Sequence, residues 1–153
     1  MQLDLGAGDI RTEGYKSVDI SDKCKPDYIW DITKLPYPKE WEGVEGVRID
    51  NVCEHIEPYT LIKVINEIHR IMKVGGILWI RVPLLKLTEK NFDGVFTDPT
   101  HVNQFTKDTF YYWDKNHRRC KIFGKDYGII PWTLLRNEEW KDNDKFLIVE
   151  LQK

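Results

Sequence analysis

The sequence predicts an α/β fold with a mostly parallel sheet, and three observations lead to this prediction. Short apolar runs at residues 2–5, 16–20 and 44–50 have the length of strands. A helical pattern and then another apolar run follow the last of these. Strands that alternate with crossover segments are typical of parallel sheets, whereas two further runs near residue 150 predict a closing antiparallel hairpin.

The clearest single element is a helix that begins at Pro58 and ends near Met72. Its apolar residues repeat with helical spacing, and they include Leu61, Ile62, Ile65, Ile68 and Ile71. Proline is well suited to a first helical position, and Gly75-Gly76 supplies a stop. The apolar run at residues 77–82 is typical of a strand that is covered on both faces. We therefore expect a three-layer α/β/α sandwich.

The remaining elements complete a seven-stranded sheet. A short third strand is expected at residues 28–30, and the last two strands at residues 131–136 and 146–151, with an antiparallel C-terminal strand. Residues 84–105 show no periodicity and predict a mobile cover over a site. Thr106 is a good N-cap for a helix over residues 108–115. We expect residues 1–153 to form one domain.

A glycine turn follows the first predicted strand directly. Gly6-Ala7-Gly8 has little side chain to keep a ligand from the backbone, and Asp19 ends the second strand, where a carboxylate can accept hydrogen bonds from a ribose. Taken alone, Gly6-Ala7-Gly8 could be only a tight turn, and Asp19 could be only a solvated strand end. Asp31 and Asn51 follow two further strands, so four strand ends converge on the edge where parallel sheets bind ligands.

A dinucleotide-binding dehydrogenase is the alternative for such a turn, and the spacing argues against it. The dinucleotide-binding motif needs a third glycine that opens a full helix. Only ten residues separate Gly8 from Asp19, which is too few for a crossover helix and the next strand. Asp9 would in addition repel a phosphate. The first crossover, residues 9–15, should therefore be a loop or a single turn.

Several segments, in this order, resemble the class I S-adenosylmethionine-dependent methyltransferases, and more narrowly a compact, methyltransferase type 11-like branch. The similar segments are residues 3–9, 14–19, 30–37, 51–56, 73–78 and 98–101, the last together with residues 105–106. The resemblance implies a Rossmann-like fold, S-adenosylmethionine as the cofactor and methyl transfer to a small-molecule or sugar-like acceptor. A catalytically silent cofactor-binding or assembly subunit with this fold is the alternative.

The resemblance also implies roles for individual residues at the strand ends. Asp4 would bind the amino group of the cofactor, Asp19 its ribose, and Asp31 with the Ile32 backbone its adenine. The full set of expected cofactor-binding residues is Asp4, Gly6, Ala7, Gly8, Asp19, Ile20, Asp31, Ile32 and Asn51.

Three residues are candidates for catalysis near the transferred methyl group. Glu54 and His55 begin the connection after the fourth strand, and His101 lies in the irregular segment. Either histidine could act as a general base with a near-neutral pKa. A structural role is open for each: Glu54-His55 could cap the next helix, and Asp98-Pro99-Thr100 could be a plain turn before His101.

Composition narrows the function classes further. The net charge of −2 predicts neither a nucleic-acid nor a membrane partner. Three distant cysteines without paired Cys or His spacing predict reduced thiols in the cytoplasm and no metal site. No helices precede the first strand, so we expect an open pocket, which a homo-oligomer or another partner could complete.

Overall fold

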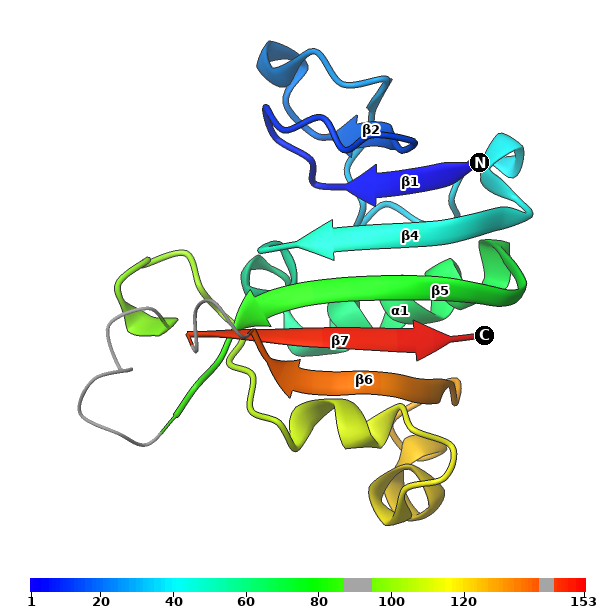
Figure 1. Ribbon diagram of the computed structural model, residues 1–153, viewed down its shortest axis with the longest axis vertical. Helices are drawn as coiled ribbons and strands as arrows, with labels where there is room; N and C mark the ends of the chain where they lie inside the picture. The colour runs from blue at the N-terminus through cyan, green and yellow to red at the C-terminus, as the bar shows by residue number, and fades with distance from the viewer. Residues whose placement is uncertain (87–94, 141–144) are drawn as a thin grey trace.

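The computed structural model describes residues 1–86, 95–140 and 145–153, and within them seven strands form one sheet (Figure 1). The strand order is β3-β2-β1-β4-β5-β7-β6. Strands β1 to β5 run parallel, and β7 is antiparallel to both β5 and β6. The bounds are β1 Gln2–Leu5, β2 Lys16–Asp19, β3 Tyr28–Ile29, β4 Val44–Asp50, β5 Met72–Pro83, β6 Thr133–Glu139 and β7 Phe146–Gln152. The predicted mostly parallel seven-stranded sheet with an antiparallel C-terminal strand is confirmed.

The core lies between the sheet and the helix α1, Pro58–Ile71. Apolar residues recur along one side of α1 and meet inward-facing residues of the central strands, which are Val47 and Ile49 of β4 and Leu78 and Ile80 of β5, all fully buried. Pro58 begins the helix as predicted. No helix within the described ranges is long and apolar enough to cross a membrane.

The other helical segments are single turns. They are η1 (Asp22–Cys24), η2 (Lys39–Trp41), η3 (Cys53–His55), η4 (Thr109–Tyr112) and the π-helical turn η5 (Cys120–Gly124). The predicted helix over residues 108–115 is wrong, because η4 is one 3₁₀ turn. Asp114 forms a β-bridge with Trp132, and the Lys115 N–H donates to the Trp132 carbonyl at 2.8 Å. This pairing with a distant segment draws the chain away from helical geometry.

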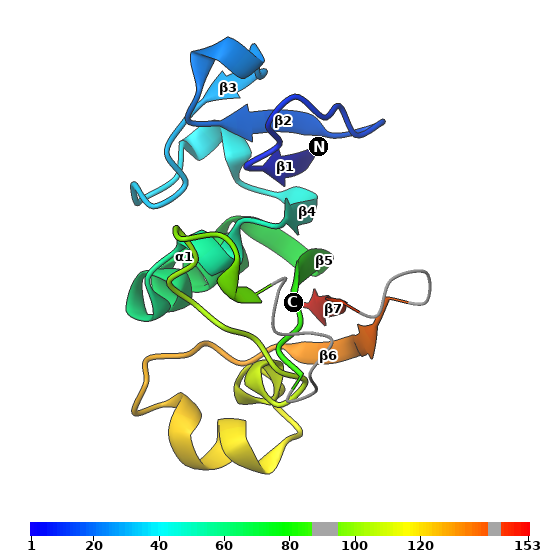
Figure 2. The same ribbon diagram turned by 90° about the vertical axis from the view of Figure 1, so that its left-hand side faces the viewer.

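Helix α1 lies on one side of the sheet (Figure 2). Residues 9–15 between β1 and β2 form a loop, as their short spacing predicted. The connection from β2 to β3 contains only the short turn η1. Neither connection is long enough for an ordinary crossover helix, so the second face of this part of the sheet has none.

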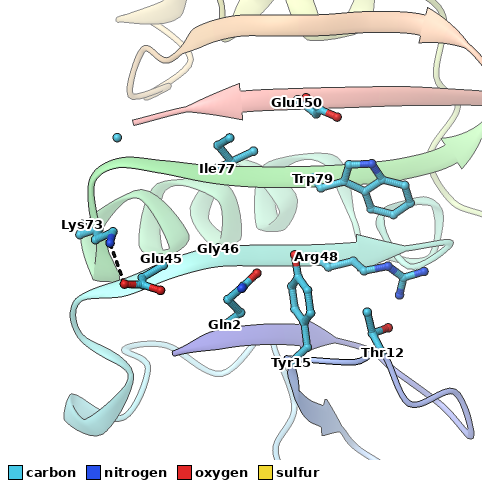
Figure 3. Close-up of a pocket in the computed structure, with 11 residues that line it drawn as sticks. Gln2, Thr12, Tyr15, Glu45, Gly46, Arg48, Lys73, Ile77, Trp79 and Glu150 are labelled. Carbon is cyan, nitrogen blue, oxygen red and sulfur yellow. Dashed lines mark hydrogen bonds and ion pairs between the residues drawn. The ribbon is translucent and has the colours of Figure 1, made fainter.

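This second face is polar, and its charges are paired with one another. A hollow of about 550 Å³ lies on it, with Arg48, Trp79 and Glu150 among its lining residues (Figure 3). Arg48 donates to Asp4 at 2.8 Å and also pairs with Asp50, which in turn pairs with Arg81. The Arg48 guanidinium lies 5.0 Å from the centre of the Trp79 ring. A face with satisfied charges does not need an apolar cover.

We expect Arg48→Ala to destabilise the protein by about 3 kcal/mol, because it leaves a buried carboxylate without its cation. Asp4 is only 1% exposed and would keep just the Thr12 hydroxyl as a side-chain partner. The matched control is Arg136→Ala, which removes a half-exposed arginine from Glu138 and Glu150 and should cost less than about 1 kcal/mol. Urea unfolding of both variants measures the difference, and equal losses would contradict the buried-pair argument.

Candidate functional site

The polar strand ends meet at one edge of the sheet. Strands β1, β2 and β4 are parallel, so the residues that follow them come out on the same side, and the segment after β5 leaves from this edge too (Figure 1). Gly6, Asp19 and Asn51 each stand at the carboxyl end of one of these strands. Two cavities open along this edge.

The turn after β1 is held by backbone hydrogen bonds and needs glycine at its first position. The Gly6 and Ala7 N–H groups donate to the Val18 carbonyl at 2.8 and 3.1 Å. Gly6 has a φ of +74°, and a Cβ there would lie 2.4 Å from Cγ2 of Val52. Any larger residue would therefore push β1 away from the segment that follows β4.

Gly8 is different, because the space beside it is open. Its φ is +53°, and a Cβ would meet no atom within 4 Å. Its N–H donates to Oδ2 of Asp19 at 2.8 Å, and the Ser21 N–H donates to Oδ1 at 2.8 Å. The carboxylate of Asp19 thus ties the glycine turn to the end of β2, and its remaining lone pairs can accept from a ligand.

The first cavity, of about 220 Å³, brings together five of the predicted cofactor residues. Its lining residues are Gly6, Asp19, Ile20, Trp30, Asp31, Ile32 and Val52. Trp30 and Val52 were missed by sequence reasoning. Trp30 lies directly before Asp31 at the end of β3, so its position beside a predicted site residue was the available signal.

Asp31 is arranged to stay ionised in this cavity. The Thr33 hydroxyl and backbone N–H donate to Oδ1 of Asp31 at 2.7 and 2.9 Å. These hydrogen bonds lower the pKa of the Asp31 carboxyl group, the hydroxyl contributing most. Both bonds use Oδ1, so Oδ2 retains its capacity to accept from a ligand.

Four of the predicted cofactor residues do not line the first cavity: Asp4, Ala7, Gly8 and Asn51. Leu3 and Leu5 point into the core, so the strand alternation turns Asp4 to the second face of the sheet. There it accepts from Arg48 at 2.8 Å and from the Thr12 hydroxyl at 2.6 Å. Asp4 does not line the first cavity. Asn51 lines the second cavity instead of the first.

The second cavity, of about 590 Å³, contains all three predicted catalytic residues. Its lining residues are Asn51, Glu54, His55, Pro83, Thr97, Asp98, Pro99, His101 and Phe146. One side-chain ligand atom each of Glu54, His55 and His101 lies within 4.8 Å of the other two. The two imidazole rings meet edge to face with their centres 4.8 Å apart. Sequence reasoning did not identify Pro83, Thr97 or Phe146 as part of this site.

Glu54 and Asn51 present unsatisfied acceptors in this region. Glu54 is 2% exposed, and its burial raises the pKa of the carboxyl group to about 7. Among the residues that the structure describes, neither Oε2 of Glu54 nor Oδ1 of Asn51 has a hydrogen-bond partner. Asn51 has a φ of +53°, an uncommon backbone conformation that occurs often at functional sites.

The structure describes residues 84–86 and 95–105 of the segment that we predicted to be a cover. Residues 87–94 of it lie outside the described residues, and its mobility stays a prediction. The backbone N–H groups of Val102 and Asn103 donate to the Glu54 carbonyl at 2.9 and 3.1 Å. These bonds join the segment to η3 and place His101 beside Glu54 and His55.

A comparison with models of protein families finds no match, and a sequence comparison with curated proteins finds none either. Solved structures are similar over 99% of this chain. A methyltransferase from Archaeoglobus fulgidus aligns over 85% of its own length, with a TM-score of 0.65 and 15% identity. One from Mesorhizobium loti aligns over 90% of its length, with a TM-score of 0.63 and 14% identity.

A third similar structure carries ligands. It is the 1,6-didemethyltoxoflavin-N1-methyltransferase of Burkholderia thailandensis with its substrate and S-adenosylhomocysteine bound, similar over 70% of its length at a TM-score of 0.63 and 13% identity. At such identities the likeness concerns the fold. The chain has the fold of the class I S-adenosylmethionine-dependent methyltransferases.

Proposed function

We propose that this protein transfers a methyl group from S-adenosylmethionine to a small-molecule or sugar-like acceptor. The observation that supports this best is the pair of neighbouring cavities at the carboxyl edge of the sheet. One has carboxylates and an aromatic wall suited to a nucleoside, and the other contains two histidines and a buried glutamate. Asn51 and Val52, adjacent in the chain, line one cavity each.

In this proposal the nucleoside of the cofactor occupies the first cavity. Asp19 accepts from the ribose hydroxyls, and Asp31 from the exocyclic amine of adenine, as charge-assisted hydrogen bonds. Trp30 and Ile32 provide apolar walls for the base. The methionine part lies along the Gly6–Gly8 turn, where the backbone is open to a ligand at Gly8. Asp4 is not among the residues that we propose to contact the cofactor.

The acceptor then lies in the second cavity, beyond Asn51. Holding the nucleophile in line with the methyl group supplies a large part of the acceleration of such a reaction. A hydroxyl acceptor must in addition lose a proton, and His101 and Glu54 are the groups placed to assist. A cavity of about 590 Å³ suits a small molecule.

The proposed setting is the cytoplasm. Cys24, Cys53 and Cys120 are free thiols, which fits a reducing compartment. A second copy of the chain or another partner could complete the open pocket, as the sequence analysis proposed. A cofactor-binding subunit without transfer activity is the alternative, and it would bind S-adenosylhomocysteine without methylating any acceptor.

Isothermal titration calorimetry should show binding of S-adenosylmethionine and S-adenosylhomocysteine and none of NAD. The reason is that the short turn after β1 lacks the helix N-terminus that holds a pyrophosphate. Tighter binding of NAD than of S-adenosylhomocysteine would refute the proposed cofactor.

Two glycine variants locate the binding site. Gly8→Ala and Gly14→Ala both place a side chain at positive φ, +53° and +80°, and in both a Cβ would meet nothing within 4 Å. Each should lose a similar stability of about 1–2 kcal/mol. Only Gly8→Ala should weaken S-adenosylhomocysteine binding, by about tenfold or more, ~1.4 kcal/mol. Equal affinities of the two variants would place the cofactor elsewhere.

His101→Ala should reduce methyl transfer by about 10²–10⁴-fold, because it removes a polar group that faces the acceptor. Cofactor affinity should change little, since His101 does not line the first cavity. The control is His117→Ala, whose ring stacks on Tyr111 away from both cavities. The assay follows S-adenosylhomocysteine release with a panel of hydroxylated acceptors. A parallel loss of cofactor binding would make His101 a structural residue.

A further inference from the structure

We propose that Glu54, His55 and His101 bind a divalent first-row transition-metal ion in the second cavity. This assignment differs from the sequence analysis, which expected no metal site because the cysteine and histidine spacings match no known pattern. Binding of the ion can be measured by itself. Its use in catalysis, where it would bind the oxygen of the acceptor, rests on the proposed methyltransferase function.

The three side chains are close enough to share an ion after small movements. One ligand atom of each lies within 4.8 Å of the others. Metal–ligand bonds to imidazole nitrogen and carboxylate oxygen are about 2.0–2.2 Å long, so ligand atoms around one ion lie roughly 3–4 Å apart. Side-chain shifts of about 1 Å would bring these atoms to that spacing.

Each of the two histidines makes a hydrogen bond through Nδ1, which leaves Nε2 of each ring available to bind a metal ion. Nδ1 of His101 lies 2.9 Å from the Val95 carbonyl, which can only accept, so this nitrogen carries the proton. The Thr100 hydroxyl donates to Asp98 at 2.6 Å and therefore accepts from Nδ1 of His55 at 2.9 Å. In the neutral form of both rings, Nε2 is then the nitrogen that can bind a metal ion.

This arrangement is the one that metal-binding histidines usually show. Their second ring N–H is nearly always donated to a backbone carbonyl, a carboxylate or a comparable acceptor, which fixes the tautomer and the ring orientation. Val95 provides a carbonyl for His101, and the Thr100–Asp98 pair provides a hydroxyl backed by a carboxylate for His55. A histidine that merely packs or caps needs no such matched pair.

A second and independent observation is that two buried acceptors have no hydrogen-bond partner among the residues that the structure describes. Oε2 of Glu54 is buried in a residue that is 2% exposed, and Oδ1 of Asn51 is buried too; both residues line this cavity. An unsatisfied buried acceptor costs about 1–3 kcal/mol, and a carboxylate oxygen costs more. A cation bound beside Glu54 would remove this cost for the carboxylate. It would also offer a partner to the amide oxygen of Asn51.

The ligand types narrow the choice of ion. Two imidazole nitrogens and one carboxylate oxygen suit Zn²⁺ or Fe²⁺, whereas Mg²⁺, Ca²⁺ and Mn²⁺ prefer sets of oxygen ligands. Three protein ligands leave a coordination position open, as catalytic zinc sites do. The cavity of about 590 Å³ gives an acceptor access to that position.

The chemistry of the transfer balances with the ion as a Lewis acid. A hydroxyl bound to the ion has a lowered pKa and releases its proton to solvent water. Its oxygen forms the new bond to the methyl carbon, the bond from that carbon to sulfur breaks, and the electron pair stays on sulfur as a neutral thioether. The ion does not change its oxidation state.

The test is a metal titration of protein that has been freed of metal with a chelator. Calorimetry with Zn²⁺ should give one equivalent, Mg²⁺ should bind far more weakly, and Co²⁺ should show the absorption bands of a protein-bound ion. Glu54→Gln and His101→Ala should each weaken Zn²⁺ binding more than 100-fold. Thr100→Val, which removes the hydroxyl between His55 and Asp98 and no proposed ligand, should weaken it about 10–100-fold. His117→Ala should bind like the unchanged protein.

The outcomes separate this proposal from the proposed function. Zn²⁺ affinity that is unchanged in Glu54→Gln and His101→Ala would overturn the metal site, whatever S-adenosylhomocysteine does. Calorimetric binding of S-adenosylhomocysteine to the metal-free protein tests the cofactor site alone. If the metal site exists and the ion acts on the acceptor, chelation should abolish transfer and leave cofactor affinity unchanged. Transfer that persists in the metal-free protein would refute the catalytic role of the ion.

Discussion

The close approach of Gly6 to Val52 is the contact on which the rest of the site depends. Because Gly6 has no Cβ, the chain that leaves β1 can pass directly against the chain that leaves β4. Val52 therefore forms a wall of the first cavity, and its neighbour Asn51 a wall of the second. The two cavities lie next to each other because Gly6, the residue directly after β1, has no side chain. The contact of the Gly6 backbone with the Val52 side chain thus sets the distance between the two sites that a transfer reaction would have to join.

The two faces of the sheet are stabilised by different forces. On the α1 face, burial of aliphatic side chains from β4, β5 and the helix supplies the hydrophobic term. On the other face, the chain of ion pairs from Asp4 through Arg48 and Asp50 to Arg81 joins β1, β4 and β5. Paired charges of this kind add little net stability, but they make the face compatible with water. The sheet can therefore retain the topology of its fold although the connections from β1 to β2 and from β2 to β3 contain no crossover helix.

The candidate acceptor site is assembled from two segments that are distant in the chain. The turn η3 presents Glu54 and His55, and the segment after β5 returns to place His101 over them through the bonds from Val102 and Asn103 to the Glu54 carbonyl. Burial of the Glu54 carboxylate would cost free energy if the group had no partner. A cation beside it, such as a metal ion held by the two histidines, would offset this cost. The unusual backbone at Asn51 lies at the same junction.

The sequence by itself determined the elements whose signals are local. Strands β1 and β4 occupy the predicted residues, Pro58 begins the helix, and the loop between β1 and β2 follows from a spacing too short for a helix. Strand ends also predicted that Gly6, Asp19 and Asp31 would share a site, since parallel strands end at one edge. Only the tertiary structure decided the partner of Asp4, because Arg48 reaches it from a neighbouring strand. The tertiary structure also decided that η4 is only one turn long, because Asp114 pairs with Trp132. It likewise brought His101 into contact with His55. These features depend on contacts between residues far apart in the chain, and periodicity and spacing carry no information about such contacts.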